Sequence, residues 1–130
     1  MSTVLLDSSV LIALTIAEHE HHASASAWLA EAGRFAVCPV VEGALVRFLV
    51  RLGESGETAR AVLEGVHRHA RCAFWPDSLS YRDLGLAGVR GHRQVTDAYL
   101  VGLAEHRRGR LATLDRALVE AHPRRTVLVA

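Results

Sequence analysis

Five short apolar runs alternate along this chain with longer segments of helical periodicity, and this alternation is what most constrains the fold. The runs lie near residues 3–6, 35–38, 72–75, 110–113 and 126–129, and the helical segments near residues 8–16, 21–32, 39–52, 57–70, 79–87, 94–107 and 115–121. Parallel strands need a crossover between them, which a helix supplies. We therefore expect an α/β fold: a five-stranded, mostly parallel sheet flanked by helices on both faces.

Residues that favour helix ends agree with this division. Pro39 suits the first turn of a helix, where a missing N–H is no loss. Gly33 and Gly53 suit helix exits, since glycine adopts the left-handed conformation found there. Ser8 or Ser9 is expected to cap the helix that follows the first run.

Size and composition predict a single domain over residues 1–130. Half of the residues are apolar, which is enough for a full core, and no linker or repeat interrupts the chain. The apolar stretch Val10–Ala17 is too short to span a bilayer, and no basic region precedes it. We expect a soluble, cytoplasmic protein with no membrane partner, in which Cys38 and Cys72 could lie close together but stay reduced.

Four carboxylates stand where an apolar run begins or ends, whereas most of the other acidic residues fall on helix faces. Asp7 and Asp115 each follow a predicted strand, and Glu42 and Asp97 lie in the first turns of strongly apolar helices. Each one alone has an ordinary structural explanation. Asp7 and Asp115 suit helix capping, and an acid in a first turn is favoured by the helix dipole.

Taken together, the four positions point to a site. In a parallel sheet, residues that end strands and residues that begin the neighbouring helices project toward the same edge. Carboxylates gathered there repel one another, and their pKa values rise unless a cation intervenes. Hard oxygen ligands favour Mg²⁺ or Mn²⁺, which keep bound waters and engage phosphates. The pattern predicts a metal-dependent active site made of Asp7, Glu42, Asp97 and Asp115.

The same residues carry a family resemblance. The run Leu5–Leu14, the helix around Glu42, the stretch Arg93–Leu100 and the ending Ala112–Asp115 resemble the PIN-domain ribonucleases, in particular the VapC toxins of bacterial toxin-antitoxin pairs. The resemblance covers essentially the whole chain, and it rests on all four pieces in order rather than on any one of them.

The resemblance implies a role for each site residue. Asp7, Asp97 and Asp115 would hold one or two Mg²⁺ or Mn²⁺ ions, and Glu42 would bind metal through water or position the nucleophile. Thr113 and Ser9 would support them, although Ser9 stands where many members of the family have asparagine. His92 and Arg93, just before the Asp97 helix, are candidates for substrate contact.

The resemblance also implies an activity and partners. The protein would be a metal-dependent endoribonuclease and the toxin of a toxin-antitoxin pair, which cleaves RNA to 5′-phosphate and 3′-hydroxyl ends and inhibits translation or growth. Whether the RNA is a tRNA, rRNA or mRNA stays open. Expected partners are a small antitoxin, with an arginine inserted among the acids, and a second copy in a homodimer.

Two rival functions remain. An aspartate-based phosphatase or receiver domain usually needs a lysine beside the phosphate, and all fifteen basic residues here are arginine. A non-catalytic RNA-binding module would leave the four acids unexplained, and the net charge of +1 argues against an unselective basic coat. The cluster Glu18–His22 could bind zinc but lacks a fixed four-ligand arrangement, so we expect a solvated helix start there.

Overall fold

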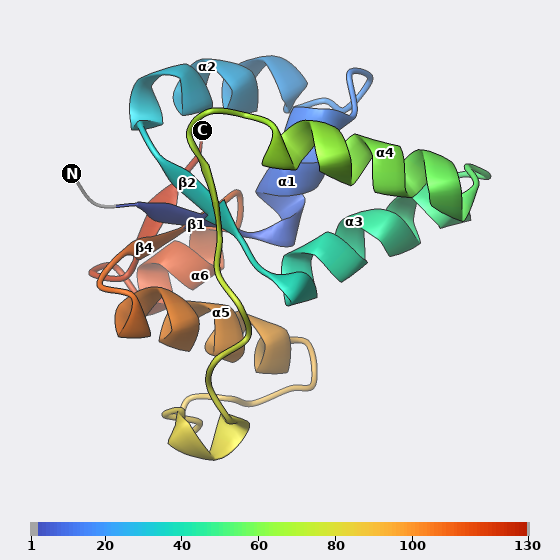
Figure 1. Ribbon diagram of the computed structural model, residues 1–130. Coiled ribbons are helices and arrows are strands. Elements are labelled where there is room, and N and C mark those ends of the chain that lie inside the picture. Colours follow the sequence, from blue (N-terminus) through green and yellow to red (C-terminus); the bar gives the residue numbers. More distant parts are fainter. Residues whose placement is uncertain (1–2, 130) are drawn as a thin grey trace.

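A parallel sheet organises the molecule, which the computed structural model describes from residue 3 to residue 129 (Figure 1). Its strands are β1 (Val4–Leu6), β2 (Phe35–Val37), β3 (Cys72–Phe74), β4 (Arg110–Thr113) and β5 (Thr126–Leu128). Their order is β3-β2-β1-β4-β5, and every neighbouring pair is parallel. The predicted five-stranded parallel sheet is confirmed.

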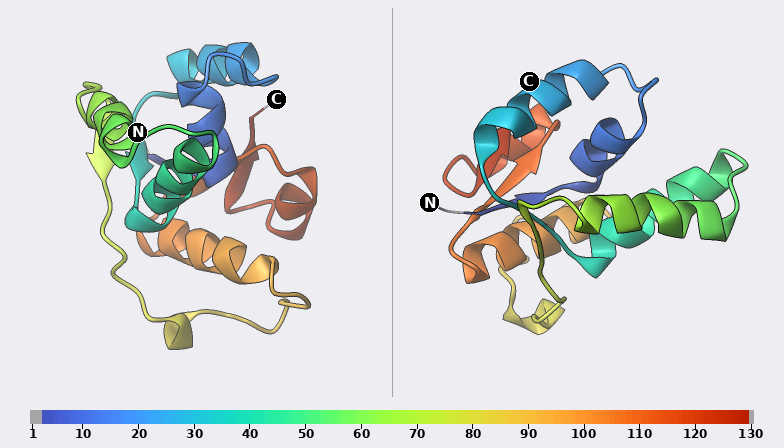
Figure 2. Two further views of the ribbon diagram at one scale, coloured as in Figure 1. Left: turned by 90° about the vertical axis from the view of Figure 1, so that its right-hand side faces the viewer. Right: turned by 45° about the horizontal axis from the view of Figure 1, so that its top comes forward.

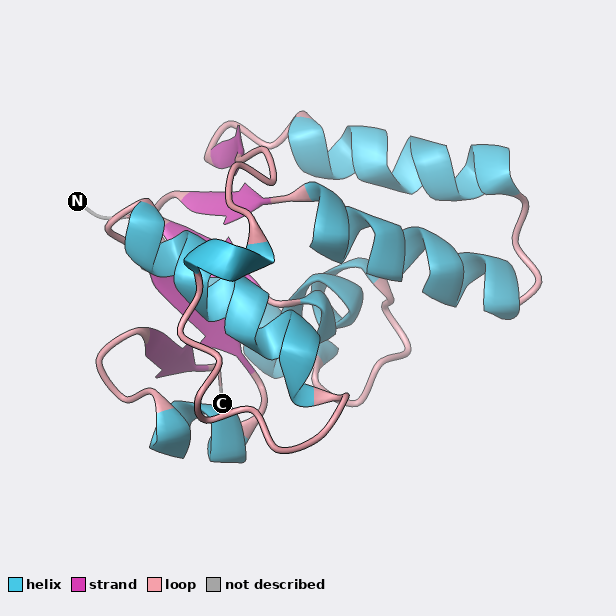
Figure 3. Ribbon diagram, turned by 90° about the horizontal axis from the view of Figure 1, so that it is seen from below, coloured by secondary structure: helices cyan, strands magenta, loops and turns pink. Residues whose placement is uncertain are grey.

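Helices cover both faces of this sheet, as expected. The helices are α1 (Ser8–Thr15), α2 (His22–Ala32), α3 (Pro39–Arg51), α4 (Gly56–His67), α5 (Gln94–His106) and α6 (Arg116–Ala121). Helices α1 and α2 lie on one face, and α5 and α6 lie on the other (Figures 1 and 2). Helices α3 and α4 pack side by side as a hairpin that projects beyond the sheet (Figure 3).

The ends of several helices follow from local sequence. Pro39 occupies the first position of α3, and Gly33 and Gly53 adopt φ values of 84° and 98° at helix exits. The expectation that Ser8 or Ser9 caps α1 is wrong. Asp7 is the cap, because its carboxylate accepts a hydrogen bond from the Ser9 backbone N–H while both serines lie inside the helix.

The helix expected over residues 79–87 is absent; only a short 3₁₀ turn, Tyr81–Asp83, forms there. The Tyr99 hydroxyl donates to the Leu79 carbonyl at 3.2 Å and so holds the start of the segment against α5. Gly85 and Gly88 then oppose helix formation, at a cost of about 1 kcal/mol each in a helix interior. The segment instead runs as a loop along α5.

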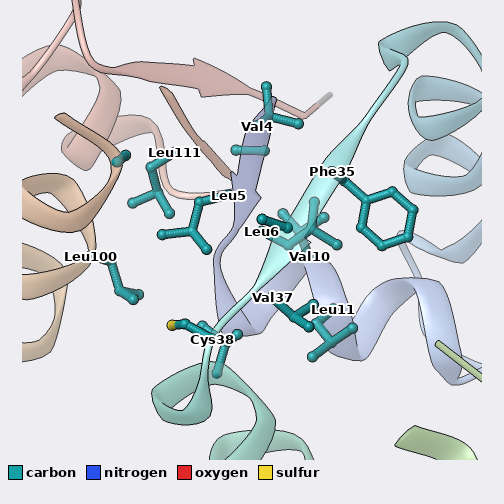
Figure 4. Packing of buried hydrophobic residues seen from close by; sticks show 14 of the residues in the cluster. Val4, Leu5, Leu6, Val10, Leu11, Phe35, Val37, Cys38, Leu100 and Leu111 are labelled. Atoms are coloured by element: carbon teal, nitrogen blue, oxygen red, sulfur yellow. The ribbon is translucent and has the colours of Figure 1, made fainter. Parts of the chain in front are cut away.

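The core fills the space between the sheet and its helices (Figure 4). All residues of β1 and β2 are buried, as expected for strands covered on both faces. Cys38 and Cys72 are both free thiols, in agreement with the expected reduced state. Between residues 3 and 129, none of the helices combines the length and apolarity needed to cross a membrane.

Candidate active site

Topology brings three of the predicted acids to the carboxyl edge of the sheet. Asp7 follows β1 and Asp115 follows the adjacent strand β4. Asp97 lies in the first turn of α5, the helix that leads back along the sheet into β4. The three acids therefore meet because β1, β4 and the start of α5 share one edge.

A chain of hydrogen bonds fixes Asp7 relative to Asp115. The Thr113 hydroxyl donates to Asp7 Oδ2 at 2.6 Å and accepts from the Asp115 backbone N–H at 3.1 Å. Asp7 Oδ1 accepts from the Ser9 N–H at 3.2 Å. Asp7 is only 7% exposed and Thr113 is fully buried, so this geometry is held by the core. Thr113 therefore links the side chain of Asp7 to the backbone of Asp115.

Asp115 is more exposed and also caps α6. Its carboxylate accepts from the backbone N–H groups of Ala117 and Leu118, at 2.9 and 3.3 Å. These bonds stabilise the start of α6 and orient the side chain. The cap explanation and the site explanation therefore apply to the same carboxylate.

Asp97 is electrostatically coupled to both of these acids. Burial raises its pKa, and the negative charges of Asp7 and Asp115 raise it further, while His122 opposes the rise. The negative charge of Asp97 is therefore disfavoured both by burial and by its two acidic neighbours. A group of three acids in this state attracts a cation.

Glu42 also lies at this edge, but its carboxylate contacts a residue outside the group of three acids. It lies in the first turn of α3, but His67 Nε2 of α4 contacts its carboxylate at 2.5 Å. Glu42 raises the pKa values of Cys72 and Asp77, in each case after burial as the larger cause. The acids at this edge thus form two groups: Asp7, Asp97 and Asp115 in one, and Glu42 with Asp77 in the other.

Three residues near the acids escaped the sequence reasoning. Asp77 follows β3 as Asp7 follows β1, so the same rule of an acid after a strand would have found it. His67 and His122 gave no such signal, because each stands at or just after the end of a helix, far in sequence from the acid that it meets.

A groove of about 720 Å³ between α5 and α6 opens beside the acids. Asp97 and Asp115 line it, as do Glu105, His106 and His122. The segment from Leu79 to Val89 forms part of its wall. We call this cavity the α5–α6 groove. His92 and Arg93, the predicted substrate contacts, are exposed positions immediately before α5 and are not among its lining residues.

The donor set fits a divalent cation in charge and in type. The three coupled acids offer only oxygen ligands, which suit Mg²⁺ or Mn²⁺. The buried Ser9 hydroxyl has no hydrogen-bond partner among the described residues, so a polar atom is left free beside Asp7. As the side chains stand, residues 3–129 contain no group of three His, Cys, Asp or Glu side chains close enough to hold one ion, and this includes the Glu18–His22 segment.

Known proteins resemble this chain over most of its length. Residues 4–122 match the family model of the PIN domain. The chain is 54% identical over 128 residues to Ribonuclease VapC29 of Mycobacterium tuberculosis, covering 98% of this chain and 96% of that protein. It is 36% identical over 130 residues to Ribonuclease VapC39 of the same species, covering 92% and 93% of the two chains.

Solved structures share the fold at low sequence identity. Mycobacterium tuberculosis VapC20, described as a sarcin-ricin loop cleaving toxin, superposes with a TM-score of 0.69 at 15% identity over 92% of this chain and 95% of that one. VapBC2 from Rickettsia felis, solved bound to a promoter DNA fragment, gives 0.68 at 13% identity over 98% and 99%. With the family match and these relatives, the chain belongs to the PIN-domain family, among the VapC ribonucleases.

Proposed function

We propose that this protein is a metal-dependent endoribonuclease and the toxin of a toxin-antitoxin pair. The observation that carries the proposal is the coupled group Asp7, Asp97 and Asp115, held at the carboxyl edge of a PIN-domain sheet beside the α5–α6 groove. The names of its relatives, Ribonuclease VapC29 and Ribonuclease VapC39, support the activity. Membership of this family argues against the phosphatase or receiver alternative.

Each residue of the proposed site has a distinct task. Asp7, Asp97 and Asp115 would hold Mg²⁺ or Mn²⁺, and such an ion supplies an activated water and offsets the charge of the phosphodiester. Thr113 fixes the orientation of Asp7 through its 2.6 Å hydrogen bond. The unpaired Ser9 hydroxyl is available to a water or to a phosphate oxygen. Glu42, held by His67, would orient groups at the other side of the edge.

Cleavage of labelled RNA tests this proposal. We expect cleavage with Mg²⁺ or Mn²⁺, none in chelator, and a loss of at least about 100-fold in Asp7→Ala and Asp97→Asn, a typical cost for removal of one charge-stabilising group. Glu64→Gln, an exposed acid of α4, is the control and should cleave normally.

The chemical groups at the ends of the cleaved RNA distinguish two mechanisms. Hydrolysis leaves a 5′-phosphate and a 3′-hydroxyl. Cleavage that survives chelator and leaves 2′,3′-cyclic phosphate would mean that the ribose hydroxyl attacks, and the metal proposal would be wrong. RNA binding without any cleavage would favour the non-catalytic alternative.

We propose two protein partners. One is a small antitoxin, which would place an arginine among the acids, where opposite charges attract. A second, apolar groove of about 490 Å³, lined by Leu11, Leu14, Leu29, Phe35 and Val62 among others, would accept an apolar segment of such a partner. The other partner is a second copy of the chain, for which exposed Val50, Leu52 and Phe74 provide apolar surface.

Sedimentation and co-purification test the partners. A homodimer at micromolar concentration and a co-purifying small protein, when the native operon is expressed, are the expected results. Monomers with no companion protein would contradict both assignments.

A further inference from the structure

Arginines gather at the edge where the strands begin, whereas the acids of the proposed site lie at the edge where the strands end. The segments that lead into β2, β3, β4 and β5 (residues 33–34, 68–71, 107–110 and 122–125) contain no acidic residue. They contain more than half of the arginines of the chain: Arg34, Arg68, Arg71, Arg107, Arg108, Arg110, Arg124 and Arg125. The opposite edge of the sheet holds the acids. We call these eight residues the amino-edge arginines.

Strand register aligns these arginines across the sheet. The backbone carbonyls of Arg34, Arg71 and Arg125 accept hydrogen bonds from the backbone N–H groups of Val4, Phe35 and Leu111 in neighbouring strands, at 3.2, 3.0 and 2.8 Å. Arg110 pairs in register with Val4 of β1. Because neighbouring strands lie about 4.8 Å apart, the arginines extend along the edge for about 20 Å.

Ordinary structural roles account for only some of them. Arg71 donates to the carbonyls of Leu29 and Gly33, at 3.1 and 3.0 Å, at the end of α2. The guanidinium of Arg107 lies over the ring of Trp75, 5.6 Å from its centroid. Arg125 forms an ion pair with Glu105 at 3.6 Å. The other five are exposed, and their side chains make no hydrogen bond or ion pair with residues 3–129: Arg34, Arg68, Arg108, Arg110 and Arg124.

Arg108 stands where glycine would favour the backbone. Its φ is 57°, in the turn that ends α5, where its N–H donates to the Glu105 carbonyl at 3.0 Å. A non-glycine residue in this left-handed conformation costs about 1 kcal/mol or more. The side chain is exposed, so packing does not compensate. An arginine thus occupies a position where the backbone conformation favours glycine.

The α5–α6 groove runs from the acids toward these arginines. Asp97 lines it near the start of α5, and His106 lines it at the last residue of that helix. At 1.5 Å per residue these two positions lie about 14 Å apart. Arg107 and Arg108 follow His106 directly, and Arg124 lies two residues beyond His122, which also lines the groove.

We propose that the amino-edge arginines form a second RNA-contact surface, which binds the phosphate backbone of the substrate where it leaves the α5–α6 groove. This inference rests on the proposed ribonuclease function. Without a bound metal ion the acids repel phosphate, so in chelator the affinity for RNA has to come from positive charge elsewhere. Arginine binds phosphate through two parallel hydrogen bonds, and a row about 20 Å long matches an extended polyanion.

Binding in chelator tests this surface without cleavage. The probe is a fluorescein-labelled single-stranded RNA of about 24 nucleotides, and the variant is Arg108→Gln/Arg110→Gln/Arg124→Gln. We expect about tenfold weaker binding and a salt dependence whose slope falls by about 2, because each lost phosphate contact removes about 0.7 in single-stranded RNA. An RNA of about 3 nucleotides should lose less affinity, because at about 3.4 Å per nucleotide it spans roughly 10 Å and cannot reach from the acids to the row.

The control removes the same charge elsewhere. Arg47→Gln/Arg51→Gln/Arg60→Gln takes three exposed arginines from the α3–α4 hairpin and should bind RNA within about twofold of wild type, since only diffuse attraction is lost. Equal losses in both triple variants would mean unspecific attraction and would overturn the proposal. If the first triple variant does not fold, the three single variants carry the test, each expected to weaken binding about twofold.

Two further outcomes are distinguishable. Polyglutamate and unlabelled RNA are each tested as competitors that displace the labelled RNA from wild type. If polyglutamate does so at a lower concentration than unlabelled RNA, the amino-edge arginines bind an acidic peptide and the RNA assignment is wrong. Cleavage by wild type with Mg²⁺ is scored separately. If wild type cleaves but the amino-edge variant binds RNA normally, this inference alone fails, whereas loss of binding without any cleavage in wild type contradicts only the proposed function.

Discussion

Asp7 combines two roles that the sequence presented as alternatives. It caps α1 through the Ser9 N–H, and it accepts the Thr113 hydroxyl at the edge where Asp97 and Asp115 meet. The two roles are compatible because a carboxylate has two oxygens, and each one serves a different partner. At the scale of single residues, capping bonds thus orient the side chains of the site.

Asp97→Asn tests the repulsion among the acids. In chelator at neutral pH we expect the variant to be more stable than wild type by up to about 1 kcal/mol, since an exposed charge pair contributes about that much. Mg²⁺ should shrink or reverse the difference, because it binds folded wild type more strongly than the variant. Thermal melts measure this, with Glu64→Gln as the control that shows neither effect.

The difference in stability between Asp97→Asn and wild type depends on pH in a defined direction. Folding raises the pKa of Asp97 above 3.8, so the folded state holds the proton more tightly than the unfolded chain. The stability that Asp97 contributes is therefore present at acid pH and is lost as the pH rises through the raised value. The gap between Asp97→Asn and wild type should narrow as the pH falls toward 3.8. A variant that is less stable than wild type at all pH values would show Asp97 to be a structural residue.

Thr113→Val removes the buried hydroxyl between Asp7 and Asp115. We expect a loss of about 1–3 kcal/mol in unfolding free energy, because a buried carboxylate loses a donor, and a clear fall in the rate of RNA cleavage. Thr113→Ser keeps the hydroxyl and should recover most of the activity. Urea denaturation and cleavage assays check the pair, and full activity in the valine variant would exclude a role for the hydroxyl.

At the scale of elements, three acids of the proposed site lie at the starts of helices. Asp7 caps the start of α1, Asp115 caps the start of α6, and Asp97 lies in the first turn of α5. Helix starts expose unpaired N–H groups and a positive dipole end, so an acid there is stabilised before any ligand binds. This explains why the local sequence at the starts of α1 and α6 predicts capping residues there.

Asp115→Ser and Asp115→Ala separate the cap of α6 from the proposed ligand. Serine still accepts from the Ala117 N–H, so it should lose only a few tenths of a kcal/mol, whereas alanine should lose about 1 kcal/mol. Both variants should lose RNA cleavage, because neither retains a carboxylate. Full cleavage by the serine variant would mean that Asp115 is a cap alone.

At the scale of the whole molecule, the alignment of the strands positions the residues at both edges of the sheet. Burial of the residues of β1 and β2 specifies their register, and Gly109 shows how closely the start of β4 approaches the start of β1. A Cβ at Gly109 would lie 2.4 Å from the backbone carbonyl oxygen of Thr3. The acids at one edge and the arginines at the other depend on this alignment.

Gly109→Ala should therefore destabilise the protein by about 1–3 kcal/mol, because a backbone atom has to move. Gly43→Ala is the matched control: it lies in α3 with no atom within 4 Å of the added Cβ, and it should stabilise by about 0.4–1 kcal/mol. Melting temperatures measure both. Equal effects at the two glycines would contradict the close approach of β1 and β4.

The sequence predicted the strands and most of the helices, because apolar period and helix-end residues are local signals. It failed at residues 79–87, where the Tyr99 hydroxyl and two glycines override an apparent helix. For the site, the sequence predicted the edge and the acids, and it missed Asp77 although the acid follows a strand. It had no means to find the contact of Glu42 with His67, because the two residues are 25 positions apart.

What the sequence determined by itself is the α/β class, the parallel sheet and the presence of acids where strands end, since each follows from short-range chemistry. The tertiary structure decided which acids meet: Asp7 and Asp115 stand together because β1 and β4 are neighbours, whereas Glu42 turns to α4. It also decided that arginines from four separate segments line the opposite edge. Strand order and register bring distant residues together, and no local pattern encodes them.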